Sequence, residues 1–368
     1  MKKLKVAVLF GGKSGEHEVS LLSAASVLNA IDKTKYDVTL IGISKAGQWL
    51  LGTDAKALLA GERGAAKRLG AGTALAANPA SALKVDVVFP VLHGTFGEDG
   101  TIQGLFELAD IAYVGSGVLG SAAGMDKDTA KRLFAAAGLP IPKHVTVLRS
   151  EWKASAKKCT ALIEKRLKYP VFVKPANLGS SVGISKVRDR SELAAAMNLA
   201  AEFDRKLVIE EGVGGKRGRA RELEVAVLGN DAPEASVVGE IVPGKEFYDY
   251  EDKYLSAGSV PIIPAKLTAT QSKQIRTMAL AAFKACECAG LARVDFLVEP
   301  DYSKKGGAGR AGRIYLNEIN TLPGFTAISM YPKLWAASGL PYVKLIDRLI
   351  ALARERHAEK QQTHFSRD

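Results

Sequence analysis

The sequence predicts a mixed α/β fold divided into several domains, and three observations indicate it. Over the first 125 residues, apolar runs of strand length alternate with amphipathic helical stretches, which is typical of a parallel sheet flanked by helices. Near residues 291–320, two further apolar strands carry polar side chains in pairs. The chain of 368 residues is long enough for two or three domains that each bury a core.

The first unit is predicted to span residues 1–125. It begins with a buried strand at residues 4–12, whose glycine-rich end leads into a loop and an amphipathic helix at residues 14–31. Strands at residues 36–44 and 85–94 and a helix at residues 101–110 continue the alternation. This repeated order of strand and helix predicts the parallel sheet.

Two further units are predicted, over residues 126–212 and 213–368. The second holds helices at residues 126–139 and 151–167 and strands at residues 169–176 and 206–213. The third holds strands at residues 221–230 and 234–242, an aromatic loop at 245–258, a helix at 269–289, and strands at 291–299 and 313–320. The last stretch, residues 353–368, is predicted to be a frayed polar tail.

Two polar pairs, Arg293 with Asp295 and Glu318 with Asn320, interrupt the two C-terminal apolar strands. Side chains at i and i+2 share one strand face, so the two pairs lie on adjacent surfaces if the strands are neighbours. Two carboxylates and an amide suit Mg²⁺, which leaves its other positions to water and substrate phosphates. The pattern predicts a magnesium site, and solvated strand-end residues are the alternative.

Phosphate-binding groups are indicated in the second unit. Lys174 ends an apolar strand, and a glycine-serine loop at residues 179–183 offers backbone and hydroxyl donors near it. Lys127, near a helix start, is a second candidate cation. Glu210 and Glu211 end a strand where their oxygens are placed to meet an adenine amino group or ribose hydroxyls. Taken singly, each of these residues is also compatible with an exposed surface position.

The glycine-rich turn at residues 11–14 matches neither common phosphate motif. A P-loop requires a glycine five positions before Gly12, where the chain has Ala7, and the glycines lack the G-x-G-x-x-G spacing. Backbone N–H groups at the start of the following helix can still hold a carboxylate or a phosphate. The turn therefore predicts either an anion site or a purely structural turn.

The net charge of +12 favours an anionic small substrate over nucleic acid. Basic residues cluster in glycine-rich stretches at residues 214–221 and 303–313, which lack the interleaved aromatics of a nucleic-acid groove. No apolar stretch reaches the roughly 18 residues of a membrane helix, and the N-terminus lacks a signal-peptide pattern. We therefore expect a cytoplasmic protein without membrane or nucleic-acid partners. Cys159, Cys286 and Cys288 are expected to be reduced packing residues.

Seven short motifs, in order, resemble the D-alanine:D-alanine ligase family over residues 4–350. They are GGKSGEHEVS (11–20), His93-Gly94 with GEDGT (97–101), MDK (125–127), Lys174-Pro175 with GSSVG (179–183), YDY (248–250) with Lys253-Tyr254, RVD (293–295), and EINT (318–321) with Pro323-Gly324. The resemblance implies the three-domain ATP-grasp fold, with ATP between the central and C-terminal domains. It also implies ATP-dependent joining of two D-alanines for peptidoglycan synthesis, and a homodimer through the N-terminal domain.

The resemblance assigns roles to single residues. The ligands of two Mg²⁺ ions, which Mn²⁺ can replace, are Asp295, Glu318 and Asn320. The ATP contacts are Lys127, Lys174, Ser181, Glu210, Glu211 and Glu222. The substrate contacts are His93, Lys253 and Ser329, and the catalytic set is Glu16, Ser180, Tyr254, Arg293 and Gly324. Within that set, Glu16 resembles the acceptor of the first D-alanine's ammonium, and Ser180 and Tyr254 resemble its hydrogen-bonding partners.

Tyr254 bears on the second substrate. In the family, a tyrosine at this position accompanies D-alanine as the nucleophile, whereas relatives that form the D-alanine:D-lactate ester carry other residues. Three alternatives stay open: a D-lactate ligase, another ATP-grasp carboxylate-amine ligase, and a non-catalytic ATP-binding module. Segment 214–221 is longer than the family's turn and hairpin 301–313 is unusually basic, which leaves the edge of the ATP pocket undefined.

Overall fold

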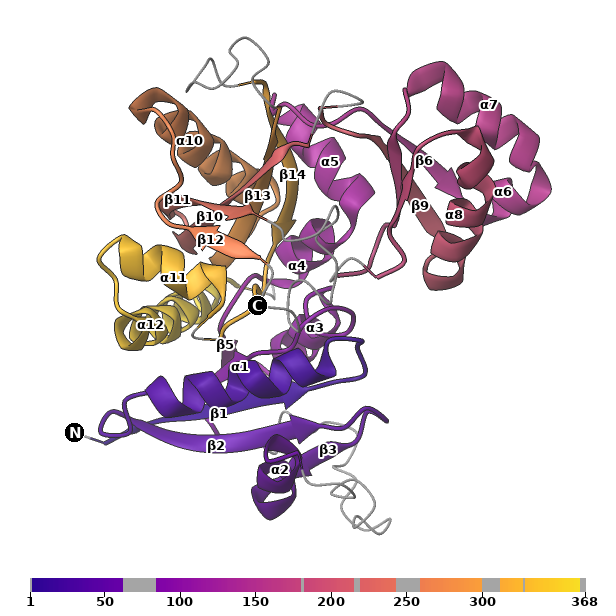
Figure 1. Cartoon of the computed structure of the whole chain (residues 1–368). Coiled ribbons are helices and arrows are strands. Elements are labelled where there is room, and N and C mark those ends of the chain that lie inside the picture. The colour runs from indigo at the N-terminus through magenta and orange to yellow at the C-terminus, as the bar shows by residue number, and fades with distance from the viewer. Residues whose placement is uncertain are drawn as a thin grey trace.

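The chain forms three β-sheets with helices packed around them (Figure 1). The structure is a computed structural model, and it describes residues 2–61, 84–179, 182–214, 219–242, 259–299, 312–326 and 328–364. None of the helices in these ranges combines the length and the apolar character needed to cross a membrane.

The N-terminal sheet has the strand order β3-β2-β1-β4-β5. Its strands are β1 (Leu4–Gly11), β2 (Tyr36–Ile43), β3 (Trp49–Leu51), β4 (Val87–Pro90) and β5 (Ala112–Tyr113). Its helices are α1 (His17–Ala30), α2 (Gly52–Leu59), α3 (Thr101–Leu108) and α4 (Val118–Met125). Strand β1 pairs in parallel with β2 and β4, and β4 with β5, so the predicted parallel sheet is confirmed. The short β3, which joins β2 antiparallel at the edge, was not predicted.

The central sheet has the order β6-β9-β7-β8 and only antiparallel pairs among its described strands. The strands are β6 (His144–Leu148), β7 (Val171–Pro175), β8 (Ser185–Val187) and β9 (Lys206–Glu211). Helices α6 (Arg149–Ala154), α7 (Ala156–Arg166) and α8 (Arg190–Phe203) accompany it. Val173 and Ile209 of the sheet pack with Ile163 and Met197 of these helices in one buried cluster.

One helix prediction in this unit is wrong. Residues 151–167 do not form a single helix, because the chain breaks between α6 and α7 at Ser155. Ser155 has φ −158° and ψ 85°, outside the helical region, and its hydroxyl accepts a hydrogen bond from the Lys158 backbone N–H. A serine side chain that caps the next helix satisfies N–H groups that the helix cannot, so the break is stabilised locally.

The C-terminal sheet is antiparallel, with the order β12-β11-β10-β13-β14. Its strands are β10 (Arg221–Gly229), β11 (Glu234–Val242), β12 (Val260–Ile262), β13 (Gly290–Val298) and β14 (Ile314–Asn320). Helices α10 (Ala269–Ala285) and α5 (Lys127–Ala136) share one buried cluster with it. Helices α11 (Met330–Ala337) and α12 (Tyr342–Lys360) belong to a second cluster with its β10, β11 and β13 residues.

The predicted polar tail is also wrong, because α12 continues to Lys360 and binds the N-terminal unit. The Arg356 guanidinium lies 4.3 Å from the Tyr113 ring centroid and donates to the Gly115 carbonyl. Lys360 pairs with Glu107. These charged side chains bind residues that are far away in the sequence. A local sequence pattern cannot reveal such partners. Residues 365–368 lie outside the described part of the chain.

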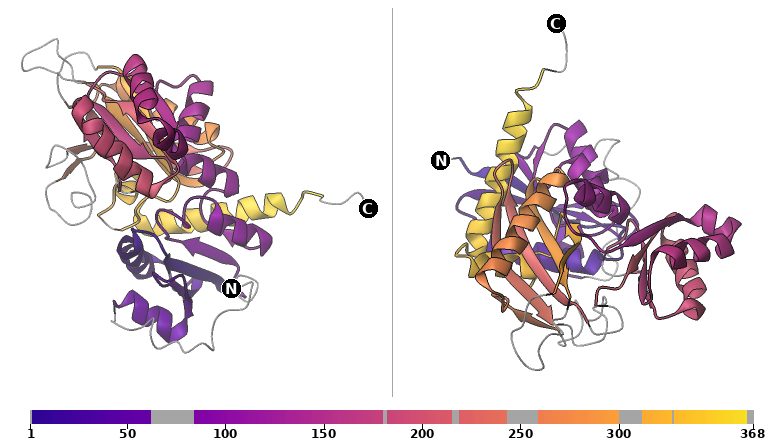
Figure 2. Two further views of the ribbon diagram at one scale, coloured as in Figure 1. Left: turned by 90° about the vertical axis from the view of Figure 1, so that its right-hand side faces the viewer. Right: turned by 90° about the horizontal axis from the view of Figure 1, so that it is seen from above.

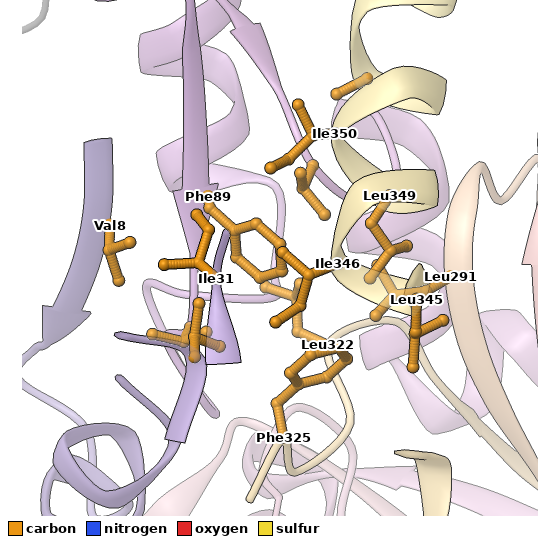
Figure 3. Close-up of a cluster of buried hydrophobic side chains, with 14 of the residues drawn as sticks. Val8, Ile31, Phe89, Leu291, Leu322, Phe325, Leu345, Ile346, Leu349 and Ile350 are labelled. Carbon is orange, nitrogen blue, oxygen red and sulfur yellow. The ribbon is translucent and has the colours of Figure 1, made fainter. Parts of the chain in front are cut away.

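A single apolar cluster joins the N-terminal sheet to α12 and to the chain after β14. Figure 3 shows Phe89 of β4 beside Ile346 of α12, with Leu322 and Phe325 completing the contact. Figure 2 shows α12 running along the boundary between the N-terminal unit and the rest. The division at residues 125 and 212 therefore stays a prediction: each range holds one sheet, yet α5 and α12 pack outside their own ranges.

The cysteines agree with their expected packing role. Cys159, Cys286 and Cys288 are all free and buried. Burial raises the pKa of Cys286 to about 12, so its thiol stays protonated near neutral pH. The three residues thus act as small apolar groups in the cores around α7 and α10.

The contact between α12 and the N-terminal sheet is testable by a pair of substitutions on one helix. Leu349 is fully buried in the joining cluster, whereas Val343 is 41% exposed. We expect Leu349→Ala to lower the free energy of unfolding by about 2–5 kcal/mol through the lost burial and the cavity. Val343→Ala should change it by less than about 0.5 kcal/mol. Equal urea midpoints for the two variants would contradict this packing.

Candidate active site

One pocket of about 320 Å³ lies where α4, α5, β14 and the loops after β1, β4 and β7 meet. Eight of the predicted site residues line it, and they come from the N-terminal, central and C-terminal units. They are Glu16, His93, Lys127, Arg293, Glu318, Asn320, Gly324 and Ser329. The structure therefore brings together residues separated by up to 313 positions in the sequence.

The Glu16 carboxylate occupies a space that two glycines keep open. Glu16 precedes α1 and is 7% exposed. A Cβ atom on Gly94 would lie 2.6 Å from Glu16 Oε2, and one on Gly179 would lie 2.7 Å from the same atom. Gly94 also has φ +74°, which favours glycine. The loops after β4 and β7 thus converge on this carboxylate, which is a suitable acceptor for an ammonium group.

Arg293 is held between two carboxylates on the pocket side of the C-terminal sheet. Its Nε donates to Asp295 Oδ1 at 2.7 Å and its Nη2 to Asp295 Oδ2 at 2.6 Å. Glu224 of β10 lies 3.4 Å from the Arg293 Nε. Burial opposes the charge, but Asp295 and Glu224 outweigh it and raise the pKa of Arg293. The guanidinium is therefore a fixed positive charge at the pocket wall.

The predicted metal ligands are neighbours on two paired strands, as expected. Asp295 lies opposite Glu318 and Arg293 lies opposite Asn320 in the antiparallel pair of β13 and β14. The pairing shifts after Asp295, so that Phe296 faces Leu316 and Asn317 forms a bulge. Leu316 and Ile319 are both buried, three positions apart instead of two. The bulge turns Glu318 and Asn320 to the pocket side, where a strict alternation would have buried Glu318.

These side chains fit Mg²⁺ by their chemistry. Asp295, Glu318 and Asn320 supply two carboxylates and an amide oxygen, and an ionised carboxylate in a bidentate arginine pair keeps acceptor sites for a cation. Within the described ranges, no group of three or more His, Cys, Asp or Glu side chains forms a metal site. A hard cation here would therefore take its remaining ligands from water and substrate oxygens, as Mg²⁺ does.

A buried ion triad connects the central unit to the C-terminal sheet. Glu210 Oε2 accepts from Lys174 Nζ at 2.8 Å, and Glu210 Oε1 lies 3.2 Å from Lys131 Nζ. Burial opposes ionisation of Glu210, but Lys131 and Lys174 outweigh it and lower its pKa to about 2. Lys131 Nζ also donates to the carbonyl oxygen of Asn317, the bulge residue, at 3.0 Å. This lysine thus ties β9 to the strand that carries Glu318.

The other predicted ATP contacts are more dispersed. Lys127 lines the pocket and donates from Nζ to the Leu178 carbonyl at 2.6 Å. Glu211 accepts from the Lys168 backbone N–H, and Glu222 lies 3.4 Å from Arg219 Nη2. Neither glutamate lines the pocket. Ser180, Ser181, Lys253 and Tyr254 lie outside the described residues, as do 215–218, the whole aromatic loop at 245–258 and 300–311.

The C-terminal wall of the pocket is the loop at residues 321–326 and the start of α11. Gly324 packs against Ser329, since a Cβ on Gly324 would lie 3.0 Å from the Ser329 Oγ. That hydroxyl accepts from the Thr326 backbone N–H at 3.1 Å. His93, 4% exposed, has both ring nitrogens within hydrogen-bond distance of protein groups, Ser23 Oγ and the Leu322 carbonyl.

Three charged residues at the site were missed by the sequence reasoning: Glu98, Lys131 and Glu224. Glu98 stands inside the motif at residues 97–101, which was noticed as a whole without a role for the carboxyl group. Glu224 follows Glu222 at i+2 in an apolar strand, the same signal that revealed Arg293 and Asp295. Lys131 follows Lys127 at i+4, so the two lysines lie on one face of the helix. The spacing does not show that Lys131 is buried.

Glu98 makes the folded state sensitive to pH. It is 4% exposed and accepts from the Gly94 backbone N–H at 2.7 Å. Burial, together with the neighbouring Glu16 charge, raises the pKa of Glu98 to about 8. The folded state then keeps a proton that the unfolded state releases above its ordinary pKa near 4.5, so stability is lost as pH rises from about 4.5 to about 8.

Glu98→Gln should remove this loss, because glutamine keeps the acceptor oxygen and does not ionise. We expect its stability relative to the unsubstituted protein to increase steadily between pH 5 and pH 8, by several kcal/mol in urea unfolding. The control is Glu18→Gln, since Lys45 lowers the pKa of Glu18 and its contribution stays constant over that range. A flat difference for Glu98→Gln would contradict a protonated Glu98.

Comparisons with known proteins agree with this geometry. The family model described as D-ala D-ala ligase N-terminus matches residues 5–116, and the model described as D-ala D-ala ligase C-terminus matches residues 133–351. The D-alanine--D-alanine ligase of Geobacillus thermodenitrificans is 50% identical over 99% of this chain and 99% of its own length. That of Chloroherpeton thalassium is 49% identical over 98% of this chain and 99% of its own.

Two solved structures share the whole fold. The D-alanine-D-alanine ligase from Coxiella burnetii superposes with a TM-score of 0.80 at 36% identity, covering 98% of this chain and 97% of its own. The VanG D-Ala:D-Ser ligase from Enterococcus faecalis gives a TM-score of 0.80 at 38% identity, covering 96% and 100%. The three-sheet α/β architecture is thus the ATP-grasp fold that the resemblance implied. By family models, full-length relatives and fold, the chain belongs to the D-alanine–D-alanine ligase family.

Proposed function

We propose that this protein joins two D-alanines into D-alanyl-D-alanine at the expense of ATP, releasing ADP and phosphate, and so supplies peptidoglycan synthesis. The observation that carries the proposal is the pocket itself. It combines an ammonium acceptor, Glu16, a partly buried guanidinium, Arg293, and the oxygen ligands Glu318 and Asn320 in one space. A ligase that activates a carboxylate and then receives an amine needs all three kinds of group.

In the first half-reaction, the carboxylate of the first D-alanine attacks the γ-phosphate of ATP and forms a D-alanyl phosphate. Glu16 holds the ammonium group of this D-alanine, so its carboxylate points to the metal side of the pocket. Lys127 and Lys174 neutralise phosphate oxygens, with Ser181 as a further donor. Asp295, Glu318 and Asn320 would hold two Mg²⁺ ions, or Mn²⁺ in their place, and bound ions would supply further charge neutralisation.

We assign the adenosine end of ATP to the region at the end of β9 in the central sheet. Glu210 and Glu211 end β9, and Glu222 lies on β10. The Glu210 carboxylate holds Lys131 and Lys174, so its contribution includes fixing the phosphate-binding lysine. Glu210, with the neighbouring Glu211, is assigned to the polar groups of the adenine, and Glu222 is assigned to the ribose hydroxyls.

In the second half-reaction, the amine of the second D-alanine attacks the acyl carbon and phosphate leaves. The tetrahedral oxyanion is stabilised by the Arg293 guanidinium and the Gly324 backbone N–H, both at the pocket wall. Lys253 and Ser329 hold the carboxylate of the second D-alanine, and His93 lies beside the first. An acyl phosphate hydrolyses readily, so we assign the role of excluding water to the aromatic loop at residues 245–258. In this assignment, Tyr254 would hydrogen-bond with Ser180 and Glu16.

The choice of the second substrate depends on Tyr254. Tyr254 favours D-alanine, but one relative of known structure is named as a D-Ala:D-Ser ligase. A D-lactate ligase, which forms an ester through a hydroxyl group, and another carboxylate-amine ligase stay as alternatives, as does a non-catalytic ATP-binding module. The module is the weakest of these, because Arg293, Asp295, Glu318 and Asn320 are all in place.

We also propose a cytoplasmic homodimer formed through the N-terminal unit. Leu108 of α3 and Leu119 of α4 are 86% and 65% exposed, and the two helices pack against each other. Large exposed apolar side chains on two adjacent helices favour an interaction site there. The test compares the sedimentation of Leu108→Glu with that of the unsubstituted protein. If the dimer forms through this surface, the variant should sediment as a monomer.

The proposed reaction is tested by phosphate release with ATP and Mg²⁺, with products identified by mass. D-alanine alone is compared with D-alanine plus D-serine, D-alanine plus D-lactate, and L-alanine. We expect release that depends on D-alanine, forms D-alanyl-D-alanine and stops when EDTA removes the metal. If the main product joined D-alanine to D-serine or D-lactate, that compound would replace D-alanine as the second substrate. No turnover with any of these substrates would contradict ligase activity.

Arg293→Lys separates charge from geometry in the oxyanion site. Lysine keeps the positive charge but loses the two parallel bonds to Asp295, so we expect kcat to fall about 10²–10³-fold. The matched control is Arg221→Lys, which breaks an equivalent two-bond pair with Glu240 on the same sheet, away from the pocket. Similar kcat values for the two variants, measured by phosphate release, would exclude the role of Arg293.

A further inference from the structure

The loop at residues 322–325, which carries the Gly324 N–H, is held by side chains at three backbone groups. His93 Nδ1 lies 2.9 Å from the Leu322 carbonyl oxygen. The Phe325 N–H donates to Ser23 Oγ at 3.3 Å, and the Phe325 carbonyl accepts from Tyr342 Oη at 2.6 Å. Two of these anchors come from the N-terminal unit and one from α12, so the loop is fixed from outside its own sheet.

Ser23 connects two of the anchors. It is fully buried on α1, and its Oγ lies 2.9 Å from His93 Nε2. A carbonyl oxygen only accepts, so the Nδ1 atom that faces Leu322 must carry a proton. In a neutral ring, Nε2 then accepts from the Ser23 hydroxyl, which in turn accepts from the Phe325 N–H. Every donor in this chain has one acceptor, and the ring has one consistent tautomer.

The surroundings favour the neutral ring. Burial lowers the pKa of His93, against an opposing effect of the Glu16 charge and the Leu322 carbonyl. Phe325 itself is 2% exposed and packs against Phe89, Tyr331 and Tyr342, with ring centroids 5.4–5.9 Å apart. Figure 3 shows its ring among the residues of the joining cluster. The loop therefore has little freedom to adjust if one anchor is removed.

We propose that Ser23 is a positioning residue for ligation: its hydroxyl fixes the His93 ring and the loop at 322–325, and thereby the direction of the Gly324 N–H at the oxyanion site. Ser23 does not line the pocket, so it acts through His93 and the loop and not on the substrate. This inference rests on the proposed function for its kinetic part, whereas its structural part stands on the hydrogen bonds alone.

The structural part is tested by ¹⁵N NMR of histidine-labelled protein. The chain has five histidines, and His93→Gln identifies the signals of His93 by their absence. We expect a neutral ring with the proton on Nδ1 in the full-length protein, and a shift of the Nε2 resonance in Ser23→Ala as its donor is lost. A His93 ring that is protonated, or that carries its proton on Nε2, would overturn the proposal, and this readout requires no turnover.

The kinetic part compares Ser23→Ala with Ser121→Ala, another fully buried serine whose hydroxyl bonds only to Ser116 among its described contacts. We expect Ser23→Ala to lower kcat about 10–100-fold with little change in KM for ATP, because loop placement affects the transition state more than nucleotide binding. Ser121→Ala should retain kcat. Equal kcat for the two variants, with both folded by urea midpoint, would overturn the proposal.

Two additional variants keep the test decisive if Ser23→Ala is unstable. Tyr342→Phe removes the third anchor and leaves Ser23 in place, so we expect a lower kcat with an unchanged His93 spectrum. Ser23→Cys keeps a weak donor of similar size and should lie between Ser23→Ala and the unsubstituted protein. If the unsubstituted protein forms no dipeptide, the proposed function fails, while the NMR result still decides whether Ser23 sets the tautomer of His93.

Discussion

The antiparallel register of β13 and β14 is the constraint on which the rest of the site depends. It places Arg293 opposite Asn320 and Asp295 opposite Glu318, so one face of two adjacent strands carries all four polar groups. On the other face, Val294, Phe296 and Ile319 are buried in the core with α10. Because a slip of one residue would exchange the two faces, burial of these apolar side chains keeps the polar groups on the opposite face, where Arg293, Glu318 and Asn320 line the pocket.

The bulge at Asn317 shifts this register just before Glu318 and so turns Glu318 and Asn320 toward the pocket. Its carbonyl oxygen accepts from Lys131, and Lys131 lies beside Glu210, which also binds Lys174. The buried charges thus connect β14, the strand of the proposed ligands Glu318 and Asn320, to the end of β9 in the central unit. Breaking one member of such a group leaves a buried charge without its partner, so the triad restricts how the two units can be arranged. The chain after β14 is restricted by neutral hydrogen bonds instead, from His93, Ser23 and Tyr342.

Local patterns in the sequence were sufficient for much of the fold. Strands such as residues 4–12 and 291–299 have apolar runs whose type and length are set by nearby residues, and they were predicted correctly. The break at Ser155 and the continuation of α12 to Lys360 were missed, because the first depends on a capping geometry and the second on partners such as Tyr113 and Glu107 far along the chain. In the site, the pairs Arg293/Asp295 and Glu318/Asn320 were visible by their spacing. The roles of Lys131 and Glu98 depend on their burial, which no local sequence pattern shows.

The central claim is that Asp295, Glu318 and Asn320 form one site for divalent ions together with a bound nucleotide. Electron paramagnetic resonance of Mn²⁺, titrated into the protein with a non-hydrolysable ATP analogue, measures this directly. The account predicts about two bound ions per chain that interact magnetically, as in two-metal sites roughly 3.5–4 Å apart, and a loss of binding in Glu318→Gln. The claim would be contradicted if the unsubstituted protein showed no nucleotide-dependent Mn²⁺ binding. It would also be contradicted if Glu318→Gln bound Mn²⁺ as well as the unsubstituted protein does.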